Sequence, residues 1–191
     1  MSVKYIHLVR HGQYVMEKNS KKYGKLTSLG RQQARHVAKR IGDYKIDKIH
    51  VSTMKRAQET ASIILKKINI PQKFDCKLLE EGIPPVHDSY LEKNKYPKYK
   101  MLQAKARMNK AFKKYFTPNK LNNETHELIV CHGNVIRYFI VKSLKLDLTK
   151  WTEFDILQCS FTTIEIRKNG RCILKCYGEI GYIPIERRTF L

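Results

Sequence analysis

The sequence predicts an α/β fold in which a mostly parallel central sheet of about six strands carries helices on both faces. Short apolar runs alternate along the chain with longer stretches of helical period. A strand followed by a helix and another strand is typical of a parallel sheet covered on both faces. The length of 191 residues suffices for one domain with a substantial core, and no repeat or low-complexity linker divides it. We therefore expect one domain over residues 1–191.

The elements follow in order from these patterns. Strands are expected at residues 4–10, 48–52, 73–78, 127–131, 161–167 and 171–177. Helices are expected at residues 28–41, 55–68, 101–116 and 134–144. Between the last two strands, Lys168, Asn169 and Gly170 are typical of a hairpin turn, which predicts an antiparallel pair at the sheet edge.

The formal net charge of +21 admits two interpretations. A strongly basic surface attracts acidic partners such as phosphoproteins, nucleic acid or anionic lipid. Alternatively, the excess reflects lysine-rich composition, because the lysines are scattered along the chain. No basic segment has the glycine and aromatic pattern of an RNA-recognition motif, so no nucleic-acid partner is expected.

Cysteine usage and hydropathy indicate the compartment. The five cysteines form an odd set without a C-x-x-C pair, which supports neither a disulfide framework nor a zinc site. No run approaches the roughly 18 consecutive apolar residues of a transmembrane segment, and a strand pattern starts at once at the N-terminus. We expect an intracellular protein, cytoplasmic if this chain is full-length.

Two histidines, His11 and His132, each directly follow a predicted strand and precede a glycine. Neighbouring side chains of a strand point to opposite faces, so Arg10 and His11 can share a ligand only if the strand stops there. Gly12 is expected to permit that turn. The helix expected after His132 has an amide-rich N-terminus that favours an anion. A histidine pair beside an arginine indicates phosphate chemistry.

Further charged residues follow the other strands. Arg56 lies in the first turn of the helix after the second strand, and Glu80 and Glu81 follow the third. In open sheets of this kind, ligands bind beyond the carboxyl ends of the strands. We therefore expect these side chains to lie near His11 and His132.

Five blocks along the chain resemble, in order, the motifs of the histidine phosphatase superfamily, also called the phosphoglycerate mutase family. They are LVRHGQ at 8–13, LTSLGRQQA at 26–34, STMKRAQETA at 52–61, LLEEG at 78–82 and VCHGN at 130–134. The likeness covers nearly the whole chain and implies a three-layer, phosphoglycerate mutase-like fold. It is greatest to the branch of mitochondrial serine/threonine protein phosphatases, through residues 10–14, 81–84, 134–138 and 178–184. This likeness implies a mitochondrial location if an N-terminal anchor was removed.

The resemblance assigns roles that phosphate chemistry explains. A phosphate monoester carries close to two negative charges near pH 7, so a neutral imidazole attacks it with less repulsion than an anion. His11 is implied to be this nucleophile. Arg10, Arg56 and His132, with Gly133, are implied to bind the phosphoryl oxygens. His132 would donate if protonated, which the neighbouring arginines allow only while phosphate is bound.

The ester bond also needs an acid, because an alkoxide is a poor leaving group. The family pattern places this acid at Glu81, whose pKa the bound phosphate would raise, while Glu80 stays open as a substitute. Gln13 and Thr27 are implied to border the phosphate. No metal or other cofactor is expected, because the carboxylates are dispersed and no Cys/His ligand cluster is present.

The remaining candidates have structural interpretations. His7 lies within a strand and is expected to be a core histidine, and Arg137 is expected to be a surface or structural residue. No motif surrounds the other four histidines, which are His36, His50, His87 and His126.

The leading prediction is a metal-independent phosphatase that acts on phosphoserine and phosphothreonine in proteins through phospho-His11. Residues 84–118 are expected to cap the site, and residues 178–191 form a tail that is a candidate homodimer contact. One alternative is a phosphoglycerate mutase or small-metabolite phosphatase, although mutases usually carry asparagine where Glu17 stands. The other is a non-catalytic scaffold that binds acidic partners, which has no need of the full set of catalytic residues.

Overall fold

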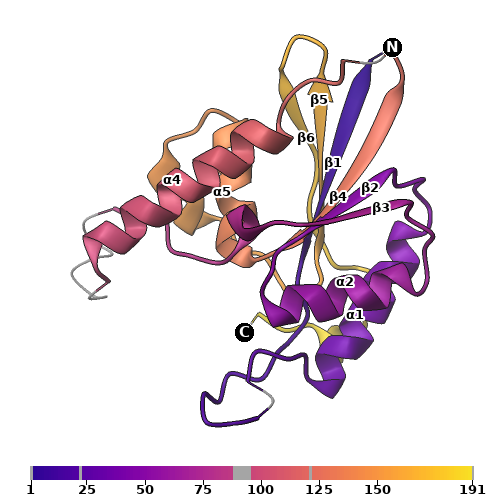
Figure 1. Cartoon of the computed structure of the whole chain (residues 1–191), viewed down its shortest axis with the longest axis vertical. Coiled ribbons are helices and arrows are strands. Elements are labelled where there is room, and N and C mark those ends of the chain that lie inside the picture. The colour runs from indigo at the N-terminus through magenta and orange to yellow at the C-terminus, as the bar shows by residue number, and fades with distance from the viewer. Residues whose placement is uncertain (1, 22, 88–95, 121, 191) are drawn as a thin grey trace.

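A six-stranded sheet runs through the centre of the molecule in the order β3-β2-β4-β1-β5-β6 (Figure 1). The computed structural model describes residues 2–21, 23–87, 96–120 and 122–190. Strands β1 to β4 pair in parallel, whereas β5 is antiparallel to both of its neighbours. The predicted mostly parallel sheet is therefore confirmed. The strands are β1 Val3–Arg10, β2 Lys48–Val51, β3 Gln72–Asp75, β4 Glu124–Cys131, β5 Phe161–Arg167 and β6 Cys172–Glu179.

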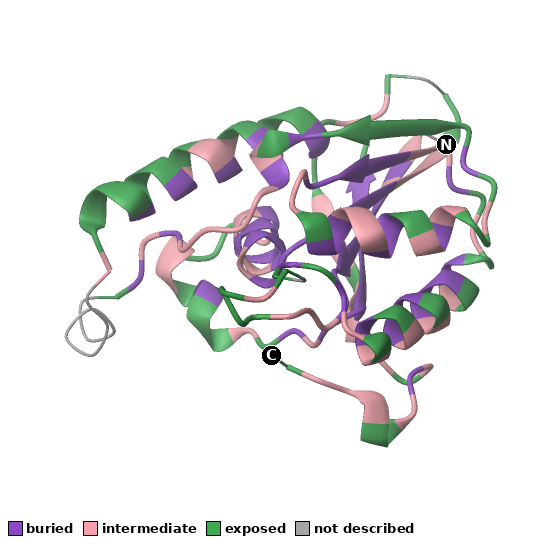
Figure 2. Cartoon of the chain, turned by 60° about the horizontal axis from the view of Figure 1, so that its bottom comes forward, coloured by how far each residue is buried: buried purple, intermediate pink, exposed green. Residues whose placement is uncertain are grey.

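Helices cover both faces of this sheet and give the predicted three layers. Helices α1 (Ser28–Ile41) and α2 (Lys55–Leu65) lie on one face, and α4 (Lys98–Tyr115) and α5 (Gly133–Ser143) lie on the other. Side chains alternate across β1 accordingly: Leu8 packs with α4 and α5, whereas Val9 packs with α1 and α2. In Figure 2 the inner faces of the helices are buried and their outer faces are exposed.

The predicted third strand, at residues 73–78, is wrong at its C-terminal end. β3 stops at Asp75, and Lys77–Leu79 form a 3₁₀ turn. All four residues of β3 are exposed, because β3 is the edge of the sheet, so no alternation of buried and exposed side chains marks where it stops. Glu80 and Glu81 directly follow this turn, beyond the carboxyl end of β3.

The C-terminal hairpin is confirmed. β5 and β6 are antiparallel, and Gly170 between them has a φ of 80°, a left-handed conformation that glycine adopts without strain. β6 is the edge strand, whereas β5 lies inside the sheet between β1 and β6.

The segment expected to cap the site, residues 84–118, contains α4. Met108, Ala111 and Tyr115 bury one side of α4 against the sheet. The start of the segment is tied to the remainder of the fold by Trp151, which donates from Nε1 to the carbonyl of Pro85 over 2.9 Å. Residues 88–95 of this segment lie outside the described residues.

The carboxyl ends of the three inner parallel strands meet at one level. Arg10 at the end of β1 is in register with Cys131 at the end of β4, and the amide of His11 donates to the carbonyl of Cys131 over 3.0 Å. The amide of Ser52 donates to the carbonyl of Val130 over 3.0 Å. The residues that follow β1, β2 and β4 are thus brought together.

Candidate active site

His11 and His132 lie side by side at this edge of the sheet, with ring centroids 5.0 Å apart. Both are buried, as are Arg10 and Arg56. Arg56 reaches the same place from the first turn of α2, since its Nε lies 2.9 Å from Nε2 of His11. The structure therefore brings together the two histidines and two arginines that the sequence singles out.

Hydrogen bonds fix the tautomer of His11. Its Nδ1 lies 2.8 Å from the carbonyl oxygen of Gly12, and a carbonyl only accepts, so Nδ1 carries the proton. Nε2 accepts from Nε of Arg56. The lone pair of Nε2 therefore faces the arginine, which is the geometry of a neutral nucleophile beside a cation that binds anions.

Burial keeps His11 neutral. Loss of hydration lowers its pKa well below the ordinary value, and the charges of Arg56 and Arg10 lower it further. The hydrogen bond to Gly12 acts in the opposite direction without reversing the shift. Nε2 of His11 thus stays unprotonated at neutral pH.

Tyr14 supports Arg56 and was not assigned a role from the sequence. The guanidinium of Arg56 lies over the Tyr14 ring, 4.5 Å from its centroid, which is a cation–π contact. The same ring meets the His11 ring edge-on at 5.2 Å. Tyr14 thus packs against both His11 and Arg56.

His132 is held by a hydroxyl group. Its Nε2 lies 2.7 Å from Oγ of Ser52, a fully buried residue directly after β2. Its Nδ1 is buried without a hydrogen-bond partner among the described residues. Burial lowers the pKa of His132 well below the ordinary value, and His11 and Arg56 add to the shift. The ring is neutral and has one nitrogen unsatisfied.

Arg10 lies beside the start of α5. One terminal nitrogen donates to the carbonyl of Ile156 over 2.6 Å, while Nε is buried without a partner in the described structure. A Cβ on Gly133 would lie only 3.4 Å from this Nε. Burial lowers the pKa of Arg10 to about 10, so the guanidinium stays charged at neutral pH. Unsatisfied nitrogens on Arg10 and His132 mark a place for an anion.

Glu81 is the carboxyl group that the two arginines influence. Burial raises its pKa above the ordinary value, while the Gly82 amide, Arg56 and Arg10 act in the opposite direction. The Gly82 amide donates to Oε1 over 3.1 Å. Glu80 differs, because its carboxylate accepts from the hydroxyl of Thr53. Of the two candidates for the acid, Glu81 is the one whose pKa the charges of Arg10 and Arg56 lower against the effect of burial.

The loop that carries Glu81 is fixed from two helices. Arg107 on α4 donates to the carbonyls of Glu80 and Glu81, the latter over 3.0 Å. Asn134 on α5 donates to the carbonyl of Gly82 over 3.1 Å. The sequence pattern did not reveal Arg107, because no motif surrounds it and it lies 26 residues from Glu81.

Gly12 is required for a different reason from the one predicted. Its φ is not in the left-handed region, so the turn after β1 does not depend on glycine's freedom. A Cβ on Gly12 would instead lie 2.5 Å from the carbonyl oxygen of Gly30, and one on Gly30 would lie 2.0 Å from that of Gln13. The start of α1 therefore packs directly on the backbone of the loop that follows β1.

Gln13 and Thr27 join the same contact. The Thr27 hydroxyl donates to Oε1 of Gln13 over 2.7 Å and accepts from the amide of Gly30, which caps α1. The Gln13 amide donates to the side chain of Gln33 over 2.9 Å. Their side chains bond to each other in this structure, and their place beside the phosphate stays a prediction.

The other singled-out residues have structural partners. His7 is fully buried between Thr163 and His126, and His50 contacts Glu127 at 3.0 Å. Arg137 forms an ion pair with Asp155 at 3.1 Å. Within the described part of the chain no group of three His, Cys, Asp or Glu side chains is placed to hold a metal ion, and no helix there is long and apolar enough to cross a bilayer.

Comparison with known proteins decides the family. The model of the histidine phosphatase superfamily (branch 1) matches residues 6–178. The chain belongs to this superfamily. It is a histidine phosphatase-family chain with the paired histidines at the carboxyl edge of its sheet.

Curated relatives of this chain include proteins that are named mitochondrial serine/threonine-protein phosphatase Pgam5. The one from Caenorhabditis briggsae is 38% identical over 97% of this chain, and the one from Drosophila yakuba is 37% identical over the same share. In both cases the chain spans 66% of the relative's length.

Solved structures share the fold. A phosphoglycerate mutase from Plasmodium falciparum superimposes with a TM-score of 0.68 at 27% identity, covering 96% of this chain and 93% of that one. YhfR of Bacillus stearothermophilus gives a TM-score of 0.75 at 22% identity, covering 95% and 100%. The phosphoglycerate mutase-like fold expected from the sequence is confirmed.

Proposed function

We propose that this chain is a metal-independent phosphatase that removes phosphate from phosphoserine and phosphothreonine in proteins through a phosphohistidine at His11. The observation that carries the chemistry is the tautomer of His11, with the proton on Nδ1 and the lone pair on Nε2. The substrate class is supported by the likeness to relatives that are named serine/threonine-protein phosphatases.

In the first step a phosphoryl oxygen replaces His11 as the acceptor of the Arg56 hydrogen bond, which frees the lone pair of Nε2. Nε2 attacks phosphorus, and the bond from phosphorus to the serine or threonine oxygen breaks. Glu81 gives its proton to that oxygen, so the leaving group departs as an alcohol. The product is phospho-His11 with an ionised Glu81.

The unsatisfied nitrogens stabilise the transferring group. Nε of Arg10 donates to a phosphoryl oxygen. His132 donates from Nδ1 when the Ser52 hydroxyl donates to its Nε2, so a neutral His132 supplies this hydrogen bond without taking up a proton. The amide-rich N-terminus of α5, which begins at Gly133, adds favourable partial charge.

In the second step water hydrolyses the phosphohistidine. The carboxylate of Glu81 takes a proton from water as its oxygen attacks phosphorus, and the bond from Nε2 to phosphorus breaks. Inorganic phosphate leaves, His11 regains its neutral form, and Glu81 is again protonated.

Two substrates with different leaving groups test the role of Glu81. Glu81→Gln should reduce kcat/KM for a phosphothreonine peptide more than for an activated aryl phosphate, which needs little acid assistance. Glu80→Gln is the matched control and should affect both substrates alike. Equal losses on the two substrates in Glu81→Gln would exclude Glu81 as the acid.

The substrate class needs its own comparison. Because the chain is also similar to a Plasmodium phosphoglycerate mutase, a small phosphorylated metabolite is the second candidate substrate. We expect kcat/KM for phosphoserine and phosphothreonine peptides to exceed that for 3-phosphoglycerate, phosphoserine and other phosphometabolites. Faster turnover of 3-phosphoglycerate with a bisphosphate primer would favour the mutase instead.

The compartment is proposed from the same relatives. Their names place them in mitochondria, and we expect proteins with this chain to be found there, which cell fractionation tests. The homodimer stays a prediction that light scattering of the purified chain tests. A scaffold without activity is the remaining alternative, and undiminished partner binding with no turnover of any phosphomonoester would favour it.

A further inference from the structure

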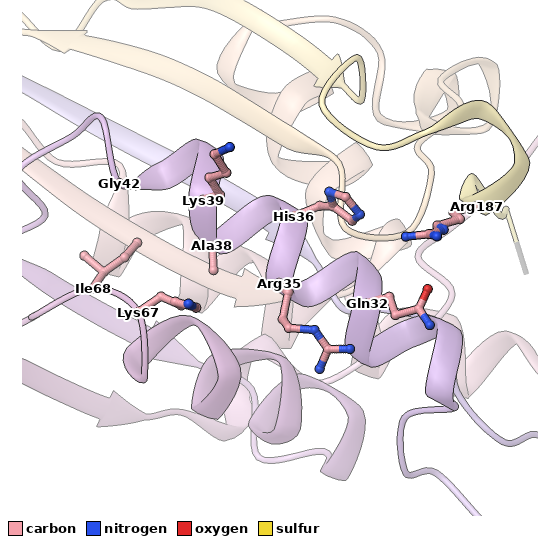
Figure 3. Close-up of a pocket in the computed structure, with 9 residues that line it drawn as sticks. All are labelled: Gln32, Arg35, His36, Ala38, Lys39, Gly42, Lys67, Ile68 and Arg187. Atoms are coloured by element: carbon pink, nitrogen blue, oxygen red, sulfur yellow. The ribbon is translucent and has the colours of Figure 1, made fainter.

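The surface of α1 away from the catalytic residues carries a basic groove, defined by Arg35, His36, Lys39, Lys67, Ile68 and Arg187 (Figure 3). Its side chains come from α1, from the turn after α2 and from the C-terminal tail. The cavity has a volume of about 690 Å³. A neighbouring cavity of about 350 Å³ shares Arg35 and Lys67 and extends the groove along α1 and α2.

The groove has an excess of cations that the fold does not neutralise. No carboxylate of the described chain lines the larger cavity. Arg35, Lys39 and Lys67 form no ion pair within the described residues, whereas Arg31 and Glu59, which both line the smaller cavity, pair with each other at 2.6 Å. Arg187 contacts its neighbour Glu186 only at 3.8 Å. The groove therefore concentrates part of the +21 net charge of the chain in one concave place.

The chemistry of the lining favours a polypeptide over a nucleic acid. Ala38 and Ile68 in the larger cavity and Ile63 in the smaller one add apolar surface between the cations. No Phe, Tyr or Trp lines either cavity in the described structure, so the imidazole of His36 is the one aromatic surface there on which a base could stack. A chain with acidic and aliphatic side chains would match both the charge and the apolar contacts.

The groove is connected to the catalytic residues through the tail and α1. Gln33 on α1 donates to the carbonyl of Arg187 and to the hydroxyl of Thr189, both over 2.7 Å. It also accepts from the amide of Gln13 in the loop that follows β1. At 1.5 Å per residue, Arg35 lies about 12 Å along α1 from its N-cap Thr27, a span that four residues of extended chain can cross.

We infer that the basic groove binds an acidic, phosphate-free segment of a protein, several residues from the phosphorylated side chain that enters the active site. Binding of the acidic segment depends only on the groove. Its use in choosing the substrate rests on the proposed protein phosphatase activity.

Direct binding tests the groove. The probe is a fluorescein-labelled, phosphate-free dodecapeptide of Glu and Asp with Leu at every third position, titrated at about 0.15 M salt, where charges beyond about 8 Å are screened. Arg35→Gln/Lys67→Gln should weaken binding at least tenfold. Lys110→Gln/Lys113→Gln removes two exposed cations from α4 and should change the Kd less than twofold. Arg35→Lys/Lys67→Arg should retain binding.

Three outcomes would overturn the inference. Equal weakening in the two glutamine double variants would show that only net charge matters, and no weakening in either would show that the peptide binds elsewhere. Tighter groove-dependent binding of a dodecamer of oligothymidine than of the peptide would assign the groove to nucleic acid. Unchanged thermal melting of the variants confirms that they fold, which is expected because Arg35 and Lys67 are exposed.

A kinetic arm separates this inference from the proposed function. Joining the acidic segment to a phosphothreonine peptide should lower KM at least fivefold, and Arg35→Gln/Lys67→Gln should abolish that gain while hydrolysis of the aryl phosphate is unchanged. If the groove binds the probe but no phosphopeptide is hydrolysed, the proposed function fails and the binding site stands. If phosphopeptides are hydrolysed with no effect of the segment, the role of the groove in substrate choice fails.

Discussion

His7 should make the stability of the fold depend on pH between 7 and 5. It is fully buried, its Nε2 lies 2.8 Å from Nδ1 of His126, and its Nδ1 lies 3.0 Å from Oγ1 of Thr163. Burial lowers the pKa of His7 to about 3, and the nearby His126 and Arg40 add to the shift. In the unfolded chain this pKa is about 6.5. As the pH falls below that value, His7 is protonated in the unfolded chain but stays neutral in the folded chain.

The magnitude follows from linkage. Stability falls wherever the unfolded state binds more protons as the pH is lowered, by up to about 1.4 kcal/mol per pH unit for one group. With a folded pKa of about 3, His7 costs the fold about 2 kcal/mol between pH 7 and pH 5. Glu127, whose pKa is lowered to about 2, contributes stability that is lost only below about pH 4.5. It therefore adds little in this window.

Urea unfolding of the natural chain and of His7→Gln at both pH values measures the effect. His11 and His132 also have lowered pKa values, but they contribute equally to both proteins and cancel in the comparison. The variant should lose about 2 kcal/mol less than the natural chain between pH 7 and pH 5. An equal loss in both proteins would refute the reasoning, because His7 would then titrate alike in the folded and unfolded states.

Three further substitutions test the contacts around the site. Arg107→Met should lower kcat/KM for a phosphothreonine peptide about tenfold to a hundredfold and affect an aryl phosphate less, since a misplaced acid is costly; an equal loss on both substrates would argue against positioning of Glu81. Gly30→Ala should destabilise the fold by about 3 kcal/mol in urea unfolding, because its Cβ would lie 2.0 Å from the carbonyl of Gln13; a change within about 0.5 kcal/mol would show that this contact relaxes freely. Ser52→Ala should lower kcat/KM about tenfold, because no hydroxyl would then determine which ring nitrogen of His132 carries the proton; unchanged kinetics would show that Ser52 does not orient His132.

The sequence indicated the fold well where burial leaves a periodic signal. The first strand was predicted to within one residue of its start, because both of its faces are covered and its apolar run is continuous. The third strand was predicted to end too late, because it is an exposed edge strand. The place of β5 between β1 and β6 depends on pairings across the chain that no local pattern contains.

The sequence likewise revealed some residues of the candidate site and not others. His11, His132, Arg10 and Arg56 were found because each follows a strand or opens a helix within a family motif, and the structure brings them together. Residues that act through tertiary contacts left no such signal. Arg107 reaches the Glu81 loop from α4, and Phe190 near the C-terminus packs over the guanidinium of Arg10 at 5.5 Å. These contacts join residues that are far apart in the sequence, so only the folded structure reveals them.

The central claim is that Nε2 of His11 carries the phosphoryl group. The most direct measurement is to mix the protein with a phosphothreonine peptide, quench in alkali within milliseconds to seconds, and locate the bound phosphate by mass spectrometry. We predict phosphate on the peptide that contains His11, stable in alkali and lost in acid, and none in His11→Ala. Phosphate on His132, Ser52 or a cysteine, or undiminished turnover in His11→Ala, would contradict the account.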